Sequence, residues 1–406
     1  MKIRSITYFC NPGYPLDEQV LRAAGEFLGK AKAAYQSAGY EVQTTRLATS
    51  PFPMLLPDRN DPGRMNGLPR LAQQLEVLIQ QAGIAYASLG PALPEQPLSY
   101  ADIPDAIAAT QNIFFGGVMA DKSRGLSFAA VRACAQVIVD SAPLDPNGFA
   151  NLRFAALANV KPGAPFFPAA YHAGDQPAFA LATEAADLAV DAFTGAGSID
   201  DARRALVAEI EKHGQALSQI SNNGLSNVRF GGIDFSLAPF PAEAQSLGTA
   251  FERLGVQAIG LHGSLAAAAI LTESIERANF PRTGFSGLMM PILEDSTLAR
   301  RAAEGTLTVK DVLLYSAVCG TGLDTVPLPG DTSVDQIFPL LLDLCALALR
   351  LDKPLTARLM PVPGKRAGEP TTFDFGFFAN SKVMALQSEP LSAPLASPQM
   401  LQLRKR

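Results

Sequence analysis

Runs of apolar residues alternate with amphipathic stretches along most of the chain. The clearest case begins with an apolar run at residues 228–237 and continues with an amphipathic stretch at 242–254. A second apolar run follows at residues 256–261. Apolar residues at helical spacing between two short continuous apolar runs predict a strand, a helix and a second strand.

Polar residues stand at the end of each of these predicted strands. Asp234 and Ser236 are two positions apart at the end of the first strand, so they share a face. His262 and Ser264 form a His-Gly-Ser turn after the second strand. Functional sites of parallel α/β sheets are built at such strand ends, and an imidazole there is a candidate general acid or base. A capping role for Asp234 and Ser264, with a buried structural His262, is the alternative interpretation.

The same alternation predicts about ten strands separated by helices, beginning with a strand at residues 2–10. This pattern is typical of an α/β protein with a largely parallel sheet, closed as a barrel or open and doubly wound. We expect one domain over residues 1–387, with a helical insert at about 178–225 that includes a helix at 178–193. Residues 388–406 form a Pro/Ser-rich tail that we expect to be extended.

Composition narrows the class of partner. The chain has 406 residues, 48% of them hydrophobic, and a net charge of −5, with no concentrated basic face to bind nucleic acid or an anionic membrane. The apolar stretch at 337–351 is too short to span a bilayer. The four cysteines show neither paired nor metal-type spacing, so we expect free thiols and a cytoplasmic protein. The Pro/Asn/Gly loop at 50–69 has the length of a functional lid or contact loop.

Two other loops contain candidate chemistry. Cys319 lies in the glycine-rich turn VCGTGLD, where a thiol is open to a substrate and can act as a nucleophile, although a buried structural thiol is equally consistent. Lys122 and Ser123 lie between a predicted strand and helix, where they can hold a phosphate or carboxylate. His172 lies in a Pro/Gly loop.

Acidic residues at later strand ends suggest another possibility. Glu294 and Asp324, together with Asp234 and His262, could form an oxygen-rich metal site. No recognised metal-binding spacing supports that set, and we assign no metal ligand. The Gly-x-Gly-x-x-Gly pattern is absent after the first strand, which disfavours a dinucleotide and leaves the cofactor unknown.

Four motifs together resemble one family, the domain-of-unknown-function 711 family, also called uncharacterised protein family 0210. They occur in a fixed order over residues 234–332, and the resemblance runs from about residue 110 to 383. The motifs are DFSLAPFP (234–241), GLHGSLAAAAIL (260–271), GFSGLMMPILED (284–295) and AVCGTGLDTVPLPGDT (317–332).

The resemblance implies a fold similar to the pyruvate formate-lyase-like glycyl radical enzymes: a barrel of about ten strands in two halves, wrapped by helices. It also implies a homodimer but supplies no activity. A glycyl radical is not expected, because the Arg-Val-x-Gly-Tyr/Phe signature is absent and only Phe375–Gly376–Phe377 stands near the end. The family's recurrent polar positions fall on Lys122, Ser123, His172, Asp234, Ser236, His262, Ser286, Glu294, Asp295, Cys319 and Asp324.

Three functions are compatible with these residues. The first is an enzyme acting on a small anionic metabolite, with Cys319 as nucleophile and His262 as acid or base, oriented by Asp234 or Asp324. The second is a divalent-metal hydrolase or lyase, and the third is a non-catalytic metabolite-binding or regulatory protein. The expected substrate contacts are Lys122, Ser123, His172, Ser236, Ser264, Ser286 and Glu294.

Overall fold

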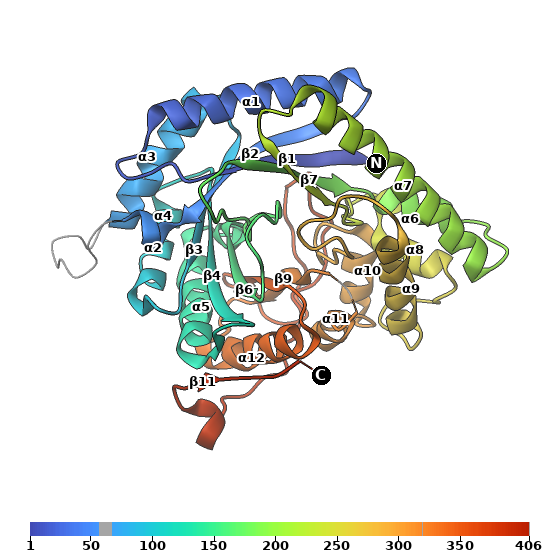
Figure 1. Cartoon of the computed structure of the whole chain (residues 1–406). Coiled ribbons are helices and arrows are strands. Elements are labelled where there is room, and N and C mark those ends of the chain that lie inside the picture. Colours follow the sequence, from blue (N-terminus) through green and yellow to red (C-terminus); the bar gives the residue numbers. More distant parts are fainter. Residues whose placement is uncertain (57–66, 319, 406) are drawn as a thin grey trace.

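A curved mixed sheet, surrounded by helices, forms the centre of the molecule (Figure 1). The structure is a computed structural model that describes residues 1–56, 67–318 and 320–405. Within these residues the strands are β1 (Lys2–Cys10), β2 (Val42–Pro51), β3 (Tyr86–Ala92), β4 (Ile113–Asp121), β5 (Gly125–Ser127), β6 (Phe154–Ala158), β7 (Ala178–Glu184), β8 (Arg229–Asp234), β9 (Gly322–Pro329), β10 (Leu355–Val362) and β11 (Met400–Leu401).

The sheet consists of two parallel sets of strands that meet antiparallel. Its order is β8-β7-β1-β2-β3-β4-β6-β10-β9, with β5 and β11 off this path. Strands β1, β2, β3, β4 and β6 are parallel to one another. The pairs β7–β8 and β10–β9 are each parallel, and they join the first set antiparallel at β1–β7 and β6–β10.

Residues 282–291 touch both end strands of this path. Isolated parallel bridges pair Arg282 with Ile233 of β8, and Pro291 with Asp324 of β9. The backbone N–H of Ile292 also donates to the carbonyl of Asp324 at 3.1 Å. Residues 282–291 are therefore an irregular segment that lies between β8 and β9.

The helices lie on the outer side of the sheet and bury their apolar faces against it (Figure 1). Their side-chain caps, such as Asp17, Ser127 and Ser198, accept bonds from the first free N–H groups. The α-helices are α1 (Glu18–Ser37), α2 (Phe52–Leu55), α3 (Gly67–Gln81), α4 (Ile103–Ala108), α5 (Phe128–Ser141), α6 (Ala186–Phe193), α7 (Ile199–Gly224), α8 (Leu247–Arg253), α9 (Ser264–Arg277), α10 (Ser296–Glu304), α11 (Val309–Tyr315) and α12 (Val334–Leu351). The 3-10 helices are η2 (Pro97–Tyr100), η3 (Ala142–Leu144), η4 (Phe149–Arg153), η5 (Glu243–Gln245) and η6 (Ala393–Ala396).

Two elements differ from the prediction. The proposed helical insert begins with a strand: β7 occupies 178–184, where the alanine-rich sequence predicts a helix. Every residue of β7 is buried, and its pairing with β1 outweighs the helix propensity of its residues. Residues 256–261, predicted as a strand, form a turn with one isolated bridge. In the tail, η6 spans Ala393–Ala396, and the short β11 pairs antiparallel with β5.

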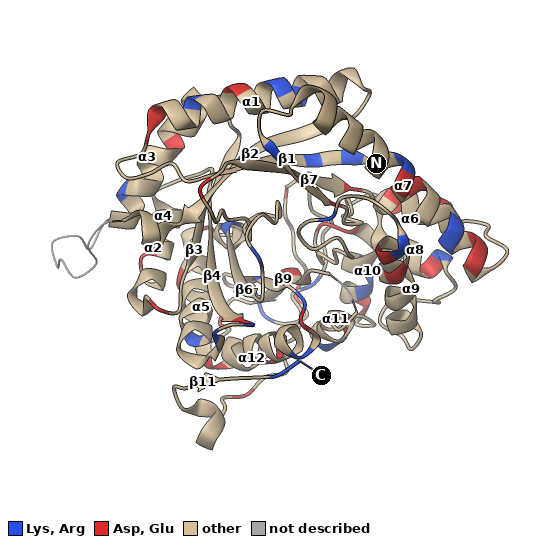
Figure 2. Ribbon diagram, viewed as in Figure 1, with Lys and Arg blue, Asp and Glu red and all other residues tan. Residues whose placement is uncertain are grey.

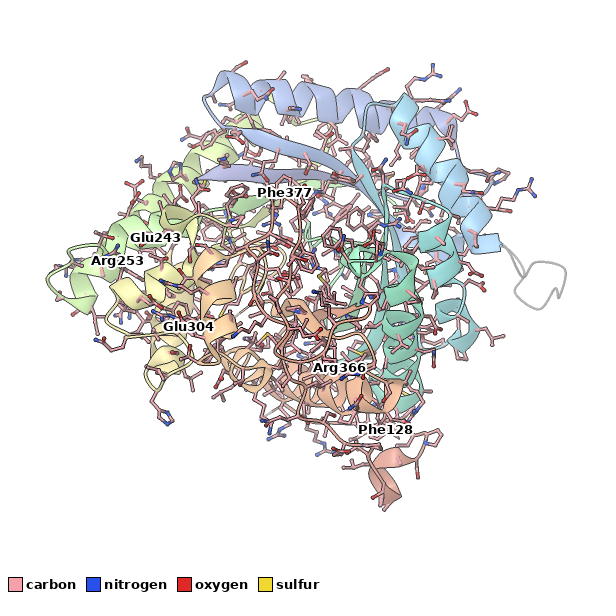
Figure 3. All side chains as sticks on the ribbon, turned by 180° about the vertical axis from the view of Figure 1, so that it is seen from behind. Phe128, Glu243, Arg253, Glu304, Arg366 and Phe377 are labelled. Atoms are coloured by element: carbon pink, nitrogen blue, oxygen red, sulfur yellow. The ribbon has the colours of Figure 1, made fainter. Side chains whose placement is uncertain are left out.

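The loop between β6 and β7, residues 159–177, lies inside the curve of the sheet, and we name it the inner loop (Figure 1). Inward-facing hydroxyl groups bind its backbone: Thr7 Oγ1 donates to the carbonyl of Pro165, and Ser88 Oγ to that of Pro168, both at 3.4 Å. Side chains fill the space around it (Figure 3). In the parts of the chain that the structure describes, no helix combines the length and apolarity of a membrane span.

Candidate functional site

Three arginines from β1, β2 and β10 gather near one another at the sheet: Arg4, Arg46 and Arg358. Most charged positions lie instead on outer elements such as α7 (Figure 2). The inner loop forms part of their surroundings, because the guanidinium of Arg46 stands 5.0 Å from the centre of the Phe167 ring, and that of Arg358 stands 5.9 Å from Phe166. Two phenylalanine rings of the inner loop therefore lie next to the arginine cluster.

Arg358 is fully paired. Its Nε donates to Oδ1 of Asp324 at 2.5 Å, and its Nη2 donates to Oε1 of Glu294 at 2.7 Å. Arg4 donates to the other carboxylate oxygen of Glu294. All three members of the Arg358 group are at most 9% exposed, so these ion pairs form in a poorly solvated environment. Glu294 and Asp324, both predicted site residues, are thus brought together by an arginine.

Burial and pairing compete in setting the charge of these carboxyl groups. Burial alone raises the pKa of Glu294, but Arg4 and Arg358 outweigh it and hold that pKa below its ordinary value. Burial raises the pKa of Asp324; Arg358 opposes the rise, and the charge on Glu294 adds to it. Burial alone lowers the pKa of Arg358, but the two carboxylates raise it above its ordinary value. Pairing therefore favours the charged forms of Glu294 and Arg358, whereas burial and the charge on Glu294 act against the charge on Asp324.

Arg46 is the arginine of this cluster without a carboxylate partner among the described residues. Its Nε donates to Oγ1 of Thr44 at 2.9 Å, and its side chain is partly exposed. Burial, together with the charges of Arg4 and Arg358, lowers the pKa of Arg46 to about 9. The guanidinium therefore remains charged at neutral pH; Glu294 stabilises that charge from a distance, but no carboxylate of the described residues forms an ion pair with it.

Asp234, Ser236 and Ser286 form a second group, which holds backbone. The Asp234 carboxylate is fully buried and accepts three hydrogen bonds: from Ser236 Oγ at 2.5 Å, and from the N–H groups of Phe285 at 3.0 Å and Ser286 at 2.7 Å. Ser286 Oγ accepts from the N–H of Phe235 at 3.2 Å. Burial raises the pKa of Asp234, and these hydrogen bonds oppose the rise. This carboxylate fixes the turn at 283–287 against β8.

The structure does not bring His262 to the aspartates expected to orient it. His262 is exposed in the turn before α9, and it makes no hydrogen bond or ion pair with Asp234 or Asp324, both of which are buried. Ser264 closes the same turn by donating to the carbonyl of Leu261 at 2.7 Å. Cys319, the expected nucleophile, falls outside the residues that the structure describes.

Lys122 and Ser123 do not form an anion site at a helix N-terminus. Lys122 pairs with Asp352 at 2.7 Å, and Ser123 Oγ donates to Asp121 at 2.6 Å within the turn between β4 and β5. Strand β5 separates this turn from α5, whose N-cap is Ser127. Both side chains are engaged in these contacts, and their role in holding an anionic substrate stays a prediction.

His172 is buried at 3% exposure in the inner loop, where its backbone N–H donates to the carbonyl of Thr49 at 2.9 Å. Its Nε2 has no hydrogen-bond partner in the structure, and burial lowers its pKa. Asp295 is the N-cap of α10, as its position in the sequence predicts.

No group of three or more His, Cys, Asp or Glu side chains that could hold a metal ion occurs among residues 1–56, 67–318 and 320–405. Of the four residues considered for such a site, Glu294 and Asp324 both pair with Arg358, hydrogen bonds engage Asp234, and His262 is exposed. Cys10, Cys134 and Cys345 are buried free thiols, as expected.

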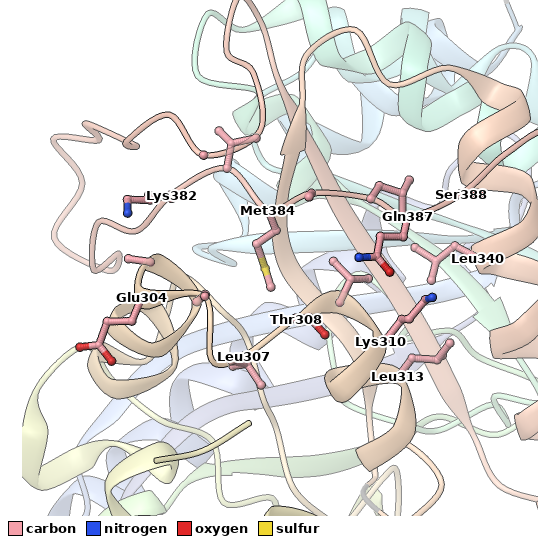
Figure 4. Close-up of a pocket in the computed structure, with 18 of the residues that line it drawn as sticks. Glu304, Leu307, Thr308, Lys310, Leu313, Leu340, Lys382, Met384, Gln387 and Ser388 are labelled. Carbon is pink, nitrogen blue, oxygen red and sulfur yellow. The ribbon is translucent and has the colours of Figure 1, made fainter. Parts of the chain in front are cut away.

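A separate groove of about 470 Å³ opens between α10, α11, α12 and the chain at 382–388 (Figure 4). The groove is lined by the apolar side chains of Leu307, Leu313 and Met384 and by the cationic side chains of Lys310 and Lys382. None of the predicted site residues and none of the three clustered arginines line it. The chemistry of the charged cluster is thus distinct from this groove.

Sequence reasoning missed the three arginines because each lies within a strand, whereas candidate residues were sought at strand ends and in loops. Arg4 stands in KIRSITYFC, Arg46 in VQTTRLATSP and Arg358 in LTARLMPV. A cation inside a buried strand is costly unless it is paired or functional, and that cost is the signal that could have found them.

The comparisons with known proteins agree with the motifs. A family model described as "Uncharacterised ACR (DUF711)" matches residues 1–380, which include all three arginines and extend well before the motif region. A UPF0210 protein of Pyrobaculum islandicum is 30% identical over 366 residues, covering 83% of this chain and 77% of its own. UPF0210 proteins of Methanopyrus kandleri and Syntrophobacter fumaroxidans are each 28% identical and cover 87% and 92% of this chain, and 81% and 85% of their own.

Proposed function

The chain belongs to the uncharacterised DUF711 family, and from that premise we propose that it binds a small anionic metabolite at Arg46. The observation that carries the proposal is the missing partner of Arg46. Its two neighbours are neutralised by buried carboxylates, whereas no carboxylate of the described residues pairs with Arg46. The names of the relatives specify no activity, so the proposal rests on the contacts and charges around Arg46.

Electrostatics favour an anion at this position. A guanidinium that burial and two like charges hold at a pKa of about 9 gains stability from any negative charge placed beside it. Its planar fork of N–H donors suits the two oxygens of a carboxylate or phosphate. Thr44 and Phe167 hold the guanidinium on one side, and its partial exposure leaves a route for a ligand.

We further propose that the sheet closes around this site as a barrel in two halves, with residues 282–291 as the irregular tenth element. The isolated bridges from that segment to β8 and β9 support closure. The antiparallel junctions between two parallel sets support the similarity to the pyruvate formate-lyase-like fold. A homodimer and a cytoplasmic location remain part of the proposal, and light scattering after size-exclusion chromatography tests the dimer.

The test is anion binding by isothermal titration calorimetry, with sodium acetate and inorganic phosphate as probes at constant ionic strength. Arg46→Gln keeps hydrogen-bonding capacity but removes the charge, and we expect it to weaken binding at least about tenfold. Arg253→Gln is the matched control, because Arg253 is half exposed and lies 3.7 Å from Glu243 on the outer surface. Equal affinity of the wild type and Arg46→Gln for both probes would contradict the proposal.

Turnover of the bound anion is the second candidate function, with Cys319 as nucleophile. One contact supports it: a Cβ on Gly320, the residue after Cys319, would lie 2.9 Å from the Cα of Gly287, so the chain at 320 packs against the turn that Asp234 fixes. Cys319→Ser should then abolish turnover while acetate binding stays unchanged. Turnover that survives this substitution would leave binding as the function.

A further inference from the structure

Three aromatic rings follow one another beside Arg46. The ring centres of Tyr86 and Phe114 are 5.5 Å apart at an interplanar angle of 78°, and those of Phe114 and Phe167 are 5.4 Å apart at 61°. The guanidinium of Arg46 lies over Phe167, and Arg46 is the direct cross-strand partner of Tyr86 between β2 and β3. Neighbouring strands lie about 4.8 Å apart, so the two side chains start from adjacent positions on the sheet, and Tyr86 acts electrostatically on Arg46.

These rings differ in burial. Phe167, at the inner loop, is 5% exposed and is enclosed by Phe9 and small residues of the sheet. Tyr86 and Phe114 pack against the same cluster but are only partly buried. No hydrogen bond of the Tyr86 hydroxyl occurs among the described residues. Apolar ring surface and a free phenol are therefore left open next to the unpaired cation.

We propose that the ligand of Arg46 is a carboxylate with an aromatic or similarly flat apolar group, held by Tyr86 and Phe114. This inference rests on the proposed function and adds the class of ligand. The carboxylate pairs with the guanidinium, while the flat group packs edge-to-face or offset against the exposed rings. A compact hydrated anion such as phosphate would satisfy Arg46 but leave the ring surface in contact with water.

The arrangement also explains why this site selects one kind of anion. An additional aromatic contact strengthens binding about two- to tenfold beyond burial of apolar area, since such pairs are worth about 0.5–1.5 kcal/mol. This additional binding energy requires two aromatic rings in contact. A bulky saturated carboxylate therefore buries apolar surface in the site but does not make the aromatic contact. Tyr86 and Phe114 thus act as specificity residues, whereas Arg46 provides the charge.

The experiment compares three probes by calorimetry: acetate, cyclohexanecarboxylate and benzoate. In the wild type we expect benzoate to bind about tenfold more tightly than acetate and about two- to fivefold more tightly than cyclohexanecarboxylate. Tyr86→Leu should remove most of the preference for benzoate over cyclohexanecarboxylate. Tyr14→Leu is the matched control, because Tyr14 is 48% exposed in the turn between β1 and α1.

Each outcome separates the two proposals. Benzoate and acetate affinities within twofold of each other, both lost in Arg46→Gln, would overturn the ligand class and leave anion binding in place. Equal affinity for benzoate and cyclohexanecarboxylate would overturn the requirement for a flat group. Binding of all probes that survives Arg46→Gln would overturn both proposals. Phe114→Leu gives a second test, and Tyr86→Leu suffices if that variant does not fold, because Tyr86 is partly exposed at the start of its strand.

Discussion

Replacing Arg358 with methionine tests how the charged cluster stabilises the protein. The side chain of Arg358 is 9% exposed and joins Glu294 and Asp324 through two charge-assisted hydrogen bonds. Methionine keeps the unbranched stem and its packing near Phe166 but removes the charge. Asp324 then remains buried without its cationic partner, while Glu294 retains Arg4.

The expected loss follows from these contacts. A hydrogen bond to a charged group contributes about 1.5–3 kcal/mol, and removing one partner of a buried ion pair costs about 3–5 kcal/mol. Most of the cost falls on Asp324, which loses its ion-pair partner in the described structure. We expect Arg358→Met to lower the free energy of unfolding at pH 7 by about 3–5 kcal/mol, a large part of the about 5–15 kcal/mol available.

The pH dependence gives the sharper prediction. In the wild type the pKa of Glu294 is lower folded than unfolded, so its stabilising contribution is present above its unfolded value of 4.5 and is lost as pH falls through the folded value. In Arg358→Met the pKa of Asp324 rises further, because the arginine that opposes its rise is gone. Protonation then relieves the variant, and its deficit relative to the wild type shrinks as pH falls from 7 towards 4.

The assay is urea denaturation followed by circular dichroism at pH 7 and pH 4.5. Arg358→Met combined with Asp324→Asn should recover part of the loss, because the second change removes the unpaired charge. Arg132→Met is the control: Arg132 pairs with Asp335 at 2.7 Å, both about half exposed, and its loss should stay below about 1 kcal/mol. A deficit of Arg358→Met below about 1 kcal/mol, or one that is equal at both pH values, would refute the reasoning.

Three further predictions concern other parts of the molecule. Gly284→Ala should destabilise the protein by about 1–3 kcal/mol in urea denaturation, because Gly284 has φ +63° and its Cβ would lie 2.2 Å from Asp234 Oδ2; Gly29→Ala, with nothing within 4 Å, should have no such cost. The pKa of His172 is lowered by burial, so stability should fall as pH drops below 6.5 while the unfolded chain takes up the proton, and a fall of equal size in His172→Gln would contradict this. Acetate affinity should stay constant between pH 6 and pH 8, because Arg46, with a pKa of about 9, keeps its charge there; a decline over that range would count against Arg46 as the anion site.

The sequence determined much of the local structure. The pattern of apolar residues predicted the strands at residues 2–10 and 228–237, where the structure has β1 and β8, because burial of one face acts over a few residues. The four motifs also identified the family.

Tertiary structure determines that residues 178–184 form the strand β7 and that His262 is exposed. The segment 178–184 has the composition of a helix, and only pairing with β1 and β8 makes it a strand. His262 looks like a strand-end residue in the sequence, but the preceding run forms a turn that leaves it exposed. Local propensity cannot anticipate either result, because the decisive partners are distant in sequence.

The charged cluster depends on tertiary structure most of all. Arg4, Arg46 and Arg358 meet because β1 pairs with β2 in parallel, while β10 runs antiparallel to the first set at the far side of the curve. The periodicity of each strand fixes which side chains share a face, but it does not fix strand order, direction or curvature. Those are decided by packing across the whole sheet, and so only the folded chain brings Arg46 close to two arginines that are already paired with carboxylates.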